Sequence, residues 1–129
     1  IGGQTYSGES CLSTVEIFDT TTNQWRSGAP MPTARCYIAL ASVGNTIYAI
    51  GGVTAFIPGG WVFSTVVEAY DILTNQWTTS TPLPNSFTGI AMSATTVNNV
   101  IYFVVYDLIG SGSTLTYSFY PTVNPCFLN

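Results

Sequence analysis

Short apolar runs separated by turn-forming residues extend along the whole chain. Cys36 to Val43 and Thr46 to Ile50 are β-rich runs on either side of a Gly-Asn pair, which is typical of a tight hairpin turn. Thr65 to Tyr70 and Gln76 to Thr79 flank a second short turn. We find no segment of useful length with helical periodicity, while Gly, Pro, Asn and Thr clusters interrupt the chain throughout. The pattern therefore predicts an all-β fold built from short antiparallel strands.

A repeat with an offset of 52 residues organises these strands. The segment from Val15 to Trp25 returns as the segment from Val67 to Trp77. Both copies have the order Val-Glu-x-aromatic-Asp followed by Thr-Asn-Gln-Trp, and a Pro-x-Pro triplet follows each of them. Because a period of 20 to 50 residues or so indicates a repeat architecture, we expect each copy to form one structural unit.

Two further features extend the repeat. Ile1 is followed by Gly2 and Gly3, just as Ile50 is followed by Gly51 and Gly52. The apolar run from Asn99 to Val105 echoes the strand before the second diglycine but lacks the glycines. The segment from Phe119 to Cys126 is a weak third copy, in which cysteine replaces the repeat tryptophan.

This ordered set of features resembles the Kelch repeat, whose family fold is the β-propeller of four-stranded antiparallel blades. The resemblance covers nearly the whole chain and implies an incomplete propeller. Residues 1–32 are expected to be the second half of a blade, residues 33–84 a complete blade and residues 85–129 a degenerate partial blade. Glycines relieve close backbone approaches, aspartates cap turns and tryptophans are expected to bury between blades. The expected structural residues of the repeat are Gly2, Gly3, Gly51, Gly52, Trp25, Trp77, Asp19 and Asp71.

The expected strands number nine: two in the first partial blade, four in the complete blade and three in the last. A closed propeller needs roughly four to eight blades, so this chain alone does not close one. Either the sequence is a fragment of a longer chain, or copies associate head to tail into an extracellular ring or filament. Both alternatives stay open at this point.

The resemblance implies a protein–protein interaction module that binds through loops at one end of the barrel. The matching loops follow each diglycine and each Pro-x-Pro triplet. In similar adaptors an arginine after the prolines contacts acidic peptides, and Arg35 holds that position, whereas the next repeat has Phe87. An ion pair of Arg35 with Glu16 or Glu68 is the structural alternative.

The loop from Val53 to Ser64 is unusually apolar for a surface segment. Phe56, Trp61 and Phe63 lie close together within it, and aromatic side chains dominate many protein interfaces. We therefore expect these three residues, with Arg35 and Phe87, to contact a partner, which is another protein or another copy of this chain.

Composition excludes several other classes of function. Histidine is absent, which removes the usual general base, the common nucleophile pairs and the commonest metal ligand, so we expect no enzyme, metal or cofactor. An enzyme resembling galactose oxidase is the least favoured alternative, because its copper site needs histidines. Lysine is also absent and the formal net charge is −4, which disfavours nucleic acid. No apolar stretch reaches the roughly 20 residues of a membrane span.

The cysteines give information on the cellular location of the protein. Cys11 and Cys36 fall at the same end of the expected barrel, so a disulfide between them is possible, and Cys126 is left over. Serine and threonine are abundant, and with lysine absent this balance favours an extracellular or cell-surface location. The alternative is a cytoplasmic adaptor with reduced thiols.

Overall fold

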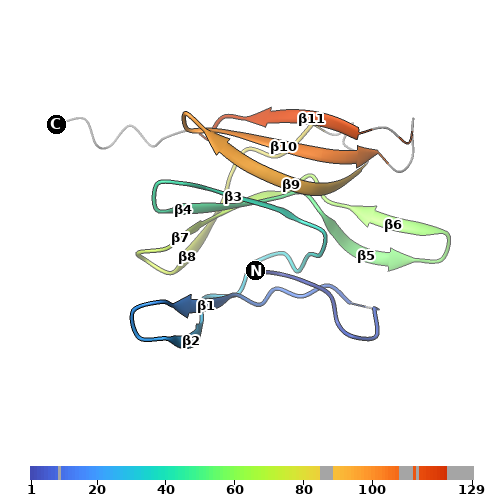
Figure 1. The fold of residues 1–129 in the computed structure, drawn as a ribbon. Helices are drawn as coiled ribbons and strands as arrows, with labels where there is room; N and C mark the ends of the chain where they lie inside the picture. Colours follow the sequence, from blue (N-terminus) through green and yellow to red (C-terminus); the bar gives the residue numbers. More distant parts are fainter. Residues whose placement is uncertain (9, 85–88, 108–111, 113, 122–129) are drawn as a thin grey trace.

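The structure is a computed structural model that describes residues 1–8, 10–84, 89–107, 112 and 114–121. These residues contain eleven strands in four antiparallel sheets, and they contain no helix (Figure 1). The all-β fold with antiparallel four-stranded sheets, expected for partial Kelch blades, is therefore confirmed.

The central sheet is a complete four-stranded blade. It consists of β3 (Ala39–Val43), β4 (Thr46–Ile50), β7 (Val67–Asp71) and β8 (Gln76–Thr79), in the spatial order β3-β4-β7-β8. The turn between β3 and β4 contains Gly44 with φ +56°, as a tight hairpin requires. All four strands fall between residues 33 and 84, so one repeat period forms this sheet.

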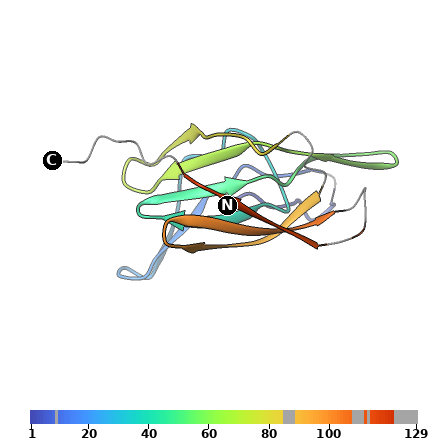
Figure 2. The same cartoon turned by 90° about the horizontal axis from the view of Figure 1, so that it is seen from above.

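Two smaller sheets are hairpins. β1 (Glu16–Asp19) pairs with β2 (Gln24–Ser27) and repeats the β7–β8 pair one period earlier. β5 (Val53–Ile57) pairs with β6 (Gly60–Phe63), and this hairpin extends sideways from the stacked sheets (Figure 2). The apolar residues of this segment predict a loop, which differs from the observed structure. It is a hairpin because Pro58-Gly59 supplies a turn between two β-rich runs.

The third sheet contains β9 (Gly89–Val97), β10 (Val100–Asp107) and β11 (Thr114–Phe119), in the order β11-β10-β9. In Figure 1 it lies on one side of the central blade, and the β1–β2 hairpin lies on the other. The main hydrophobic core fills the space between the central blade and the third sheet. Its buried side chains are Ala39, Ile50, Val67, Leu83, Ala91, Ile101, Phe103, Val105 and Phe119.

The two repeat turns have the same construction. Asp19 Oδ1 accepts hydrogen bonds from the backbone N–H groups of Thr21 and Thr22, at 2.8 and 3.2 Å. Asp71 Oδ1 accepts the corresponding bonds from Leu73 and Thr74, at 2.8 and 2.9 Å. These backbone bonds lower the pKa of both carboxyl groups, because they stabilise the charged form. Each aspartate therefore caps its turn.

The diglycines allow the chain to pass close to another backbone segment. Gly52 has φ +96°, and a Cβ atom there would lie 2.6 Å from the carbonyl oxygen of Cys36. Gly2 has φ +65°, and its Cβ would lie 2.6 Å from the carbonyl oxygen of Arg35. Both positions therefore require glycine for two reasons, the left-handed backbone and the close approach.

These two reasons can be separated by comparing Gly52→Ala with Gly59→Ala. Gly59 has φ +88° but no heavy atom within 4 Å of its Cβ position, so Gly59→Ala should cost only the conformational penalty of about 1–2 kcal/mol. Gly52→Ala should lower the free energy of unfolding by about 1–3 kcal/mol more than Gly59→Ala, because its Cβ atom also forces residue 52 away from the backbone of Cys36. Urea unfolding measures both values, and equal losses would contradict the close-approach argument.

Candidate functional site

Arg35 lies between β2 and β3, and its side chain is fully buried. Its Nη2 atom lies 2.7 Å from Glu68 Oε2 in an ion pair. Its Nη1 atom donates to the carbonyl oxygens of Gly51 and Val66, at 2.8 Å each. The expectation that Arg35 contacts a partner is thus corrected: its side chain is buried, its Nη1 and Nη2 donors are used inside the blade, and the pairing with Glu68 is the alternative that the sequence left open.

The Arg35 backbone joins this blade to the preceding segment. Its N–H group donates to the carbonyl oxygen of Leu12 at 3.0 Å, and its own carbonyl accepts from the N–H group of Gly3 at 3.1 Å. Thr33 Oγ1 donates to the second carboxylate oxygen of Glu68 at 2.8 Å. Burial lowers the pKa of Arg35, while the charge and hydrogen bond of Glu68 act in the opposite direction. The arginine stays charged because its reference pKa is so high.

Three aromatic residues form an exposed group beside this junction, which we call the aromatic cluster: Tyr37, Phe56 and Trp61. The rings of Tyr37 and Trp61 are stacked, with centroids 5.3 Å apart and an interplanar angle of 14°. Phe56 meets Trp61 edge-on, with centroids 5.8 Å apart. Tyr37 is 44% exposed and Trp61 38% exposed, so a large part of each ring is available to a partner.

Tyr37 is held in a strained backbone conformation. Its φ of +53° is rare for a bulky residue, and such conformations concentrate at functional sites. The left-handed residue also explains why β3 begins at Ala39, three residues later than the predicted run. Its hydroxyl donates to Gln4 Oε1 at 3.1 Å, which fixes the ring from a second side. Sequence reasoning missed Tyr37, because its residue type gives no signal of positive φ.

An apolar cleft of about 410 Å³ continues from Tyr37 into the space between the central blade and the third sheet. Its lining residues come from the two positions before β3, the start of β9 and the end of β10, and none of them carries a charge. They are Tyr37, Ile38, Ile90, Ala91 and Tyr106. The cluster and the cleft therefore form one continuous, mainly apolar surface.

The other expected contacts differ in their placement. Phe63 is half-buried at the end of β6, where it pairs with Val53 across the hairpin. Phe87 lies outside the described residues. Trp77 is half-buried and donates from Nε1 to the carbonyl oxygen of Ala29 at 2.8 Å, whereas Trp25 is 70% exposed. Burial of the repeat tryptophan between blades is thus seen at Trp77 and not at Trp25.

The structure joins Cys11 and Cys36 by a disulfide, with Cα atoms 5.2 Å apart and a sequence separation of 25. Cys11 forms an isolated bridge with Gln4, and Cys36 directly precedes Tyr37. The disulfide therefore connects the two segments whose side chains, Gln4 and Tyr37, hydrogen-bond to each other.

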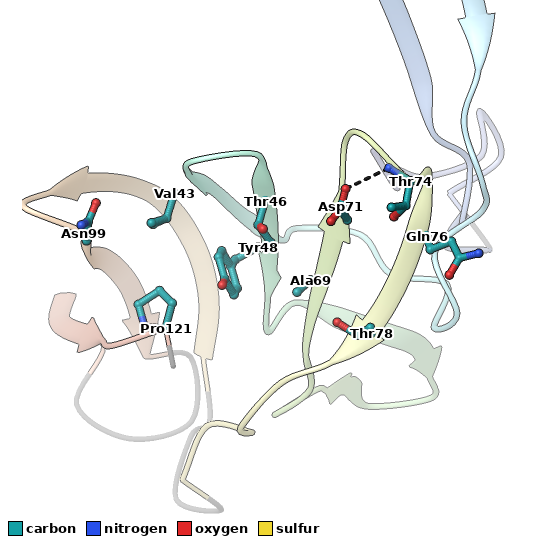
Figure 3. A pocket seen from close by; sticks show the side chains of 10 residues that line it. All are labelled: Val43, Thr46, Tyr48, Ala69, Asp71, Thr74, Gln76, Thr78, Asn99 and Pro121. Carbon is teal, nitrogen blue, oxygen red and sulfur yellow. Dashed lines mark hydrogen bonds between the residues drawn. The ribbon is translucent and has the colours of Figure 1, made fainter. Parts of the chain in front are cut away.

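A second, more polar groove of about 360 Å³ crosses the outer part of the central blade (Figure 3). It is lined by residues of all four strands of that blade, by Thr74 of the β7–β8 turn, and by Asn99 and Pro121 from the side of the third sheet. Its carboxylate, Asp71, is already bonded to its own turn, as the dashed line to Thr74 shows. Pro121, which lines the groove, is followed by residues that the structure does not describe, so one wall of the groove is incompletely defined and we do not assign it as a site.

Two further features were considered for the described residues, a metal-binding cluster and a membrane-spanning helix, and neither is present there. No group of three or more His, Cys, Asp and Glu side chains there is arranged to hold a metal ion. No helix there is long and apolar enough to cross a membrane.

Stacked antiparallel sheets with diglycine crossings and capped turns define a repeat protein of propeller blades. Residues 1–32 and 34–84 match the family model of the Kelch motif, and the chain belongs to this family. It is 28% identical over 116 residues to human Kelch-like protein 23, covering 90% of this chain and 19% of that protein. It is 35% identical over 94 residues to rat Kelch-like protein 36, covering 70% and 15%. The chain thus spans less than a fifth of the length of these relatives.

Removing one partner of the buried ion pair should lower the free energy of unfolding strongly. Arg35→Met leaves the carboxylate of Glu68 buried and unpaired, which typically costs about 3–5 kcal/mol. Arg26→Met is the matched control: Arg26 is exposed on β2, and the change should stay within about 0.5 kcal/mol. The double variant Arg35→Met, Glu68→Met should lose less stability than Arg35→Met alone, because it leaves no unpaired charge in the interior. Chemical denaturation tests this ordering, and similar losses for both arginine variants would contradict it.

The disulfide can be tested by counting thiols. Denaturation without reductant should expose a single reactive thiol, that of Cys126, whereas three should appear after reduction. Cys11→Ser should lower the free energy of unfolding by about 3 kcal/mol, because the unfolded chain is then no longer cross-linked between positions 11 and 36 and gains conformational entropy. Three reactive thiols without reductant would show that the bond does not form.

Proposed function

We propose that the chain is a protein-binding module that engages its partner through the aromatic cluster and the apolar cleft next to it. The observation that carries this proposal is the strained, exposed Tyr37, stacked on Trp61 and continuous with the cleft. Membership of the Kelch family agrees with a binding role.

The physical basis is a preformed aromatic surface. Tyrosine and tryptophan bury large areas with few rotatable bonds, and they are frequent among the residues that dominate binding energy. Here the stacking, the Gln4 hydrogen bond and the disulfide fix the rings before a partner arrives. Part of the entropic cost of binding is therefore already met in the free protein.

The chemistry of the surface indicates what kind of partner fits. Arg35 is not available to an acidic peptide, because its guanidinium group is buried against Glu68. The cleft lining consists of aromatic and aliphatic side chains without charge. A segment that presents apolar or aromatic side chains matches this surface better than a strongly acidic one.

A binding role without catalysis is part of the proposal. It is supported by the absence of histidine from the sequence and by the internal use of the carboxylates of Asp19, Glu68 and Asp71. We also propose an extracellular or cell-surface location, which the Cys11–Cys36 disulfide supports, since such bonds persist in oxidising compartments.

Quantitative affinity capture tests the binding surface. A partner retained by the unmodified chain should be lost with Tyr37→Ala combined with Trp61→Ala, and its affinity should fall at least about tenfold, equivalent to 1.4 kcal/mol. Leu73→Ala is the control, because Leu73 is a highly exposed apolar residue on the β7–β8 turn. Unchanged binding of every partner by the double variant, with its fold verified by circular dichroism, would reject this site.

A further inference from the structure

The disulfide joins two parts of the chain that meet at the aromatic cluster. Cys36 exchanges both backbone hydrogen bonds with Val53, at 3.0 and 2.8 Å. It is therefore fixed to the base of the β5–β6 hairpin, which carries Trp61. Cys11 forms its isolated bridge with Gln4, and we call this pair of residues the loop bridge.

The backbone just before the loop bridge is anchored without the disulfide. The N–H group of Gly3 donates to the carbonyl oxygen of Arg35 at 3.1 Å, and that of Leu12 donates to Gly3 at 2.8 Å. Arg35 in turn donates to Leu12 at 3.0 Å. Gln4 and Cys11 are the next residues along the two segments. The disulfide is therefore the covalent tie that holds the loop bridge against the hairpin.

Tyr37 lies between the loop bridge and the hairpin, and its own contacts are non-covalent. Its ring stacks on Trp61, and its hydroxyl donates an exposed hydrogen bond to Gln4 at 3.1 Å. One ring stack and one exposed hydrogen bond stabilise about as much as the left-handed backbone of a bulky residue costs. The stacked arrangement is thus close to balance, so it depends on a tie that keeps Gln4 in place.

We propose that the Cys11–Cys36 disulfide is a redox switch of the aromatic cluster. When the bond is closed, it keeps Gln4 within reach of the Tyr37 hydroxyl and the ring of Tyr37 on Trp61. When the bond is open, the loop bridge leaves the hairpin and Tyr37 relaxes from its left-handed conformation. The consequence for binding rests on the proposed function: the surface engages its partner under oxidising conditions and releases it under reducing ones.

The switch is opened by a dithiol. Cys11 is half-buried and Cys36 only 2% exposed, so a thiolate of the dithiol attacks Cys11 Sγ. The S–S bond breaks, and Cys36 leaves as a thiolate and takes up a proton. The second thiol of the reagent then displaces Cys11 from the mixed disulfide, and this thiolate is protonated in turn. Two electrons and two protons pass to the protein, and the dithiol becomes a disulfide.

Fluorine NMR of the chain labelled with 5-fluorotryptophan measures the stack directly. The three tryptophans, Trp25, Trp61 and Trp77, give three resonances, which single Trp→Phe variants assign. Tyr37→Ala supplies the position of the Trp61 resonance without the stack. Cys126→Ser in every sample removes the third cysteine, so that thiol counting reports on the one disulfide.

Reduction with dithiothreitol should move the Trp61 resonance at least about halfway to its position in Tyr37→Ala, because the stacked fraction falls. Reoxidation should restore it. The resonances of Trp25 and Trp77 are the internal control and should stay in place, because these rings belong to the β1–β2 and β7–β8 hairpins, which the disulfide does not join. A Trp61 resonance that stays in place, while two free thiols are counted, would overturn the proposal.

A variant with the disulfide intact keeps the proposal testable if reduction unfolds the chain, which would collapse all three resonances together. Gln4→Ala removes the acceptor of the Tyr37 hydroxyl and should move the Trp61 resonance in the direction of Tyr37→Ala. The matched control is Gln24→Ala, at an exposed glutamine on β2, which should leave that resonance unchanged. The same result for both glutamine variants would contradict the switch.

A binding measurement separates this inference from the proposed function. A partner obtained by affinity capture should bind the reduced chain at least about threefold more weakly, since only the stacked fraction is competent to bind. Equal binding to both forms, with a Trp61 resonance that responds to reduction, would reject the aromatic cluster as the binding surface. A resonance that does not respond, with binding still lost in the Tyr37→Ala, Trp61→Ala variant, would overturn the switch alone.

Discussion

The buried pair of Arg35 and Glu68 is the interaction on which the arrangement of this chain depends. A buried charge is tolerated only when it is paired and its remaining donors are satisfied. The two Nη groups of Arg35 are satisfied by Glu68 and by carbonyl groups beside the diglycine, whereas its buried Nε has no hydrogen-bond partner among the described residues. The Arg35 backbone bonds to Gly3 and Leu12 of the preceding segment. One residue thus fixes the interior of a blade and its junction to the previous one.

The position of the candidate binding surface follows from that junction. Cys36 and Tyr37 come directly after Arg35, so the disulfide and the strained tyrosine begin from an anchored point. A left-handed conformation in a bulky residue persists only when its surroundings determine it from several sides. Here the junction, the disulfide and the Gln4 hydrogen bond do so together. The exposed rings are therefore supported by the same contacts that stabilise the blades.

The sequence could predict the parts of the structure that repeat. The 52-residue offset located the hairpins and the aspartate-capped turns, and the recurring diglycine located the close backbone approach, because each depends on local residue types. It could not decide between a buried and an exposed Arg35, since the partner lies 33 positions away. Nor could it identify Tyr37, whose importance comes from a backbone angle. The β5–β6 hairpin had a local signal in Pro58-Gly59, which the apolar character of the segment obscured.

The degenerate third copy illustrates the same physical constraint. One repeat after Arg35 the sequence has Phe87, and the counterpart of Glu68 in the third copy, in which Cys126 stands at the position of Trp77, is Tyr117. Both charged partners are therefore replaced together, each by an aromatic residue. Replacing a whole buried ion pair by apolar groups is often nearly neutral, whereas removing one partner alone leaves a charge in the interior. Replacing both residues together is therefore less costly than replacing either one alone. In this copy the repeat has lost both members of the charged pair, so neither is left as an unpaired charge.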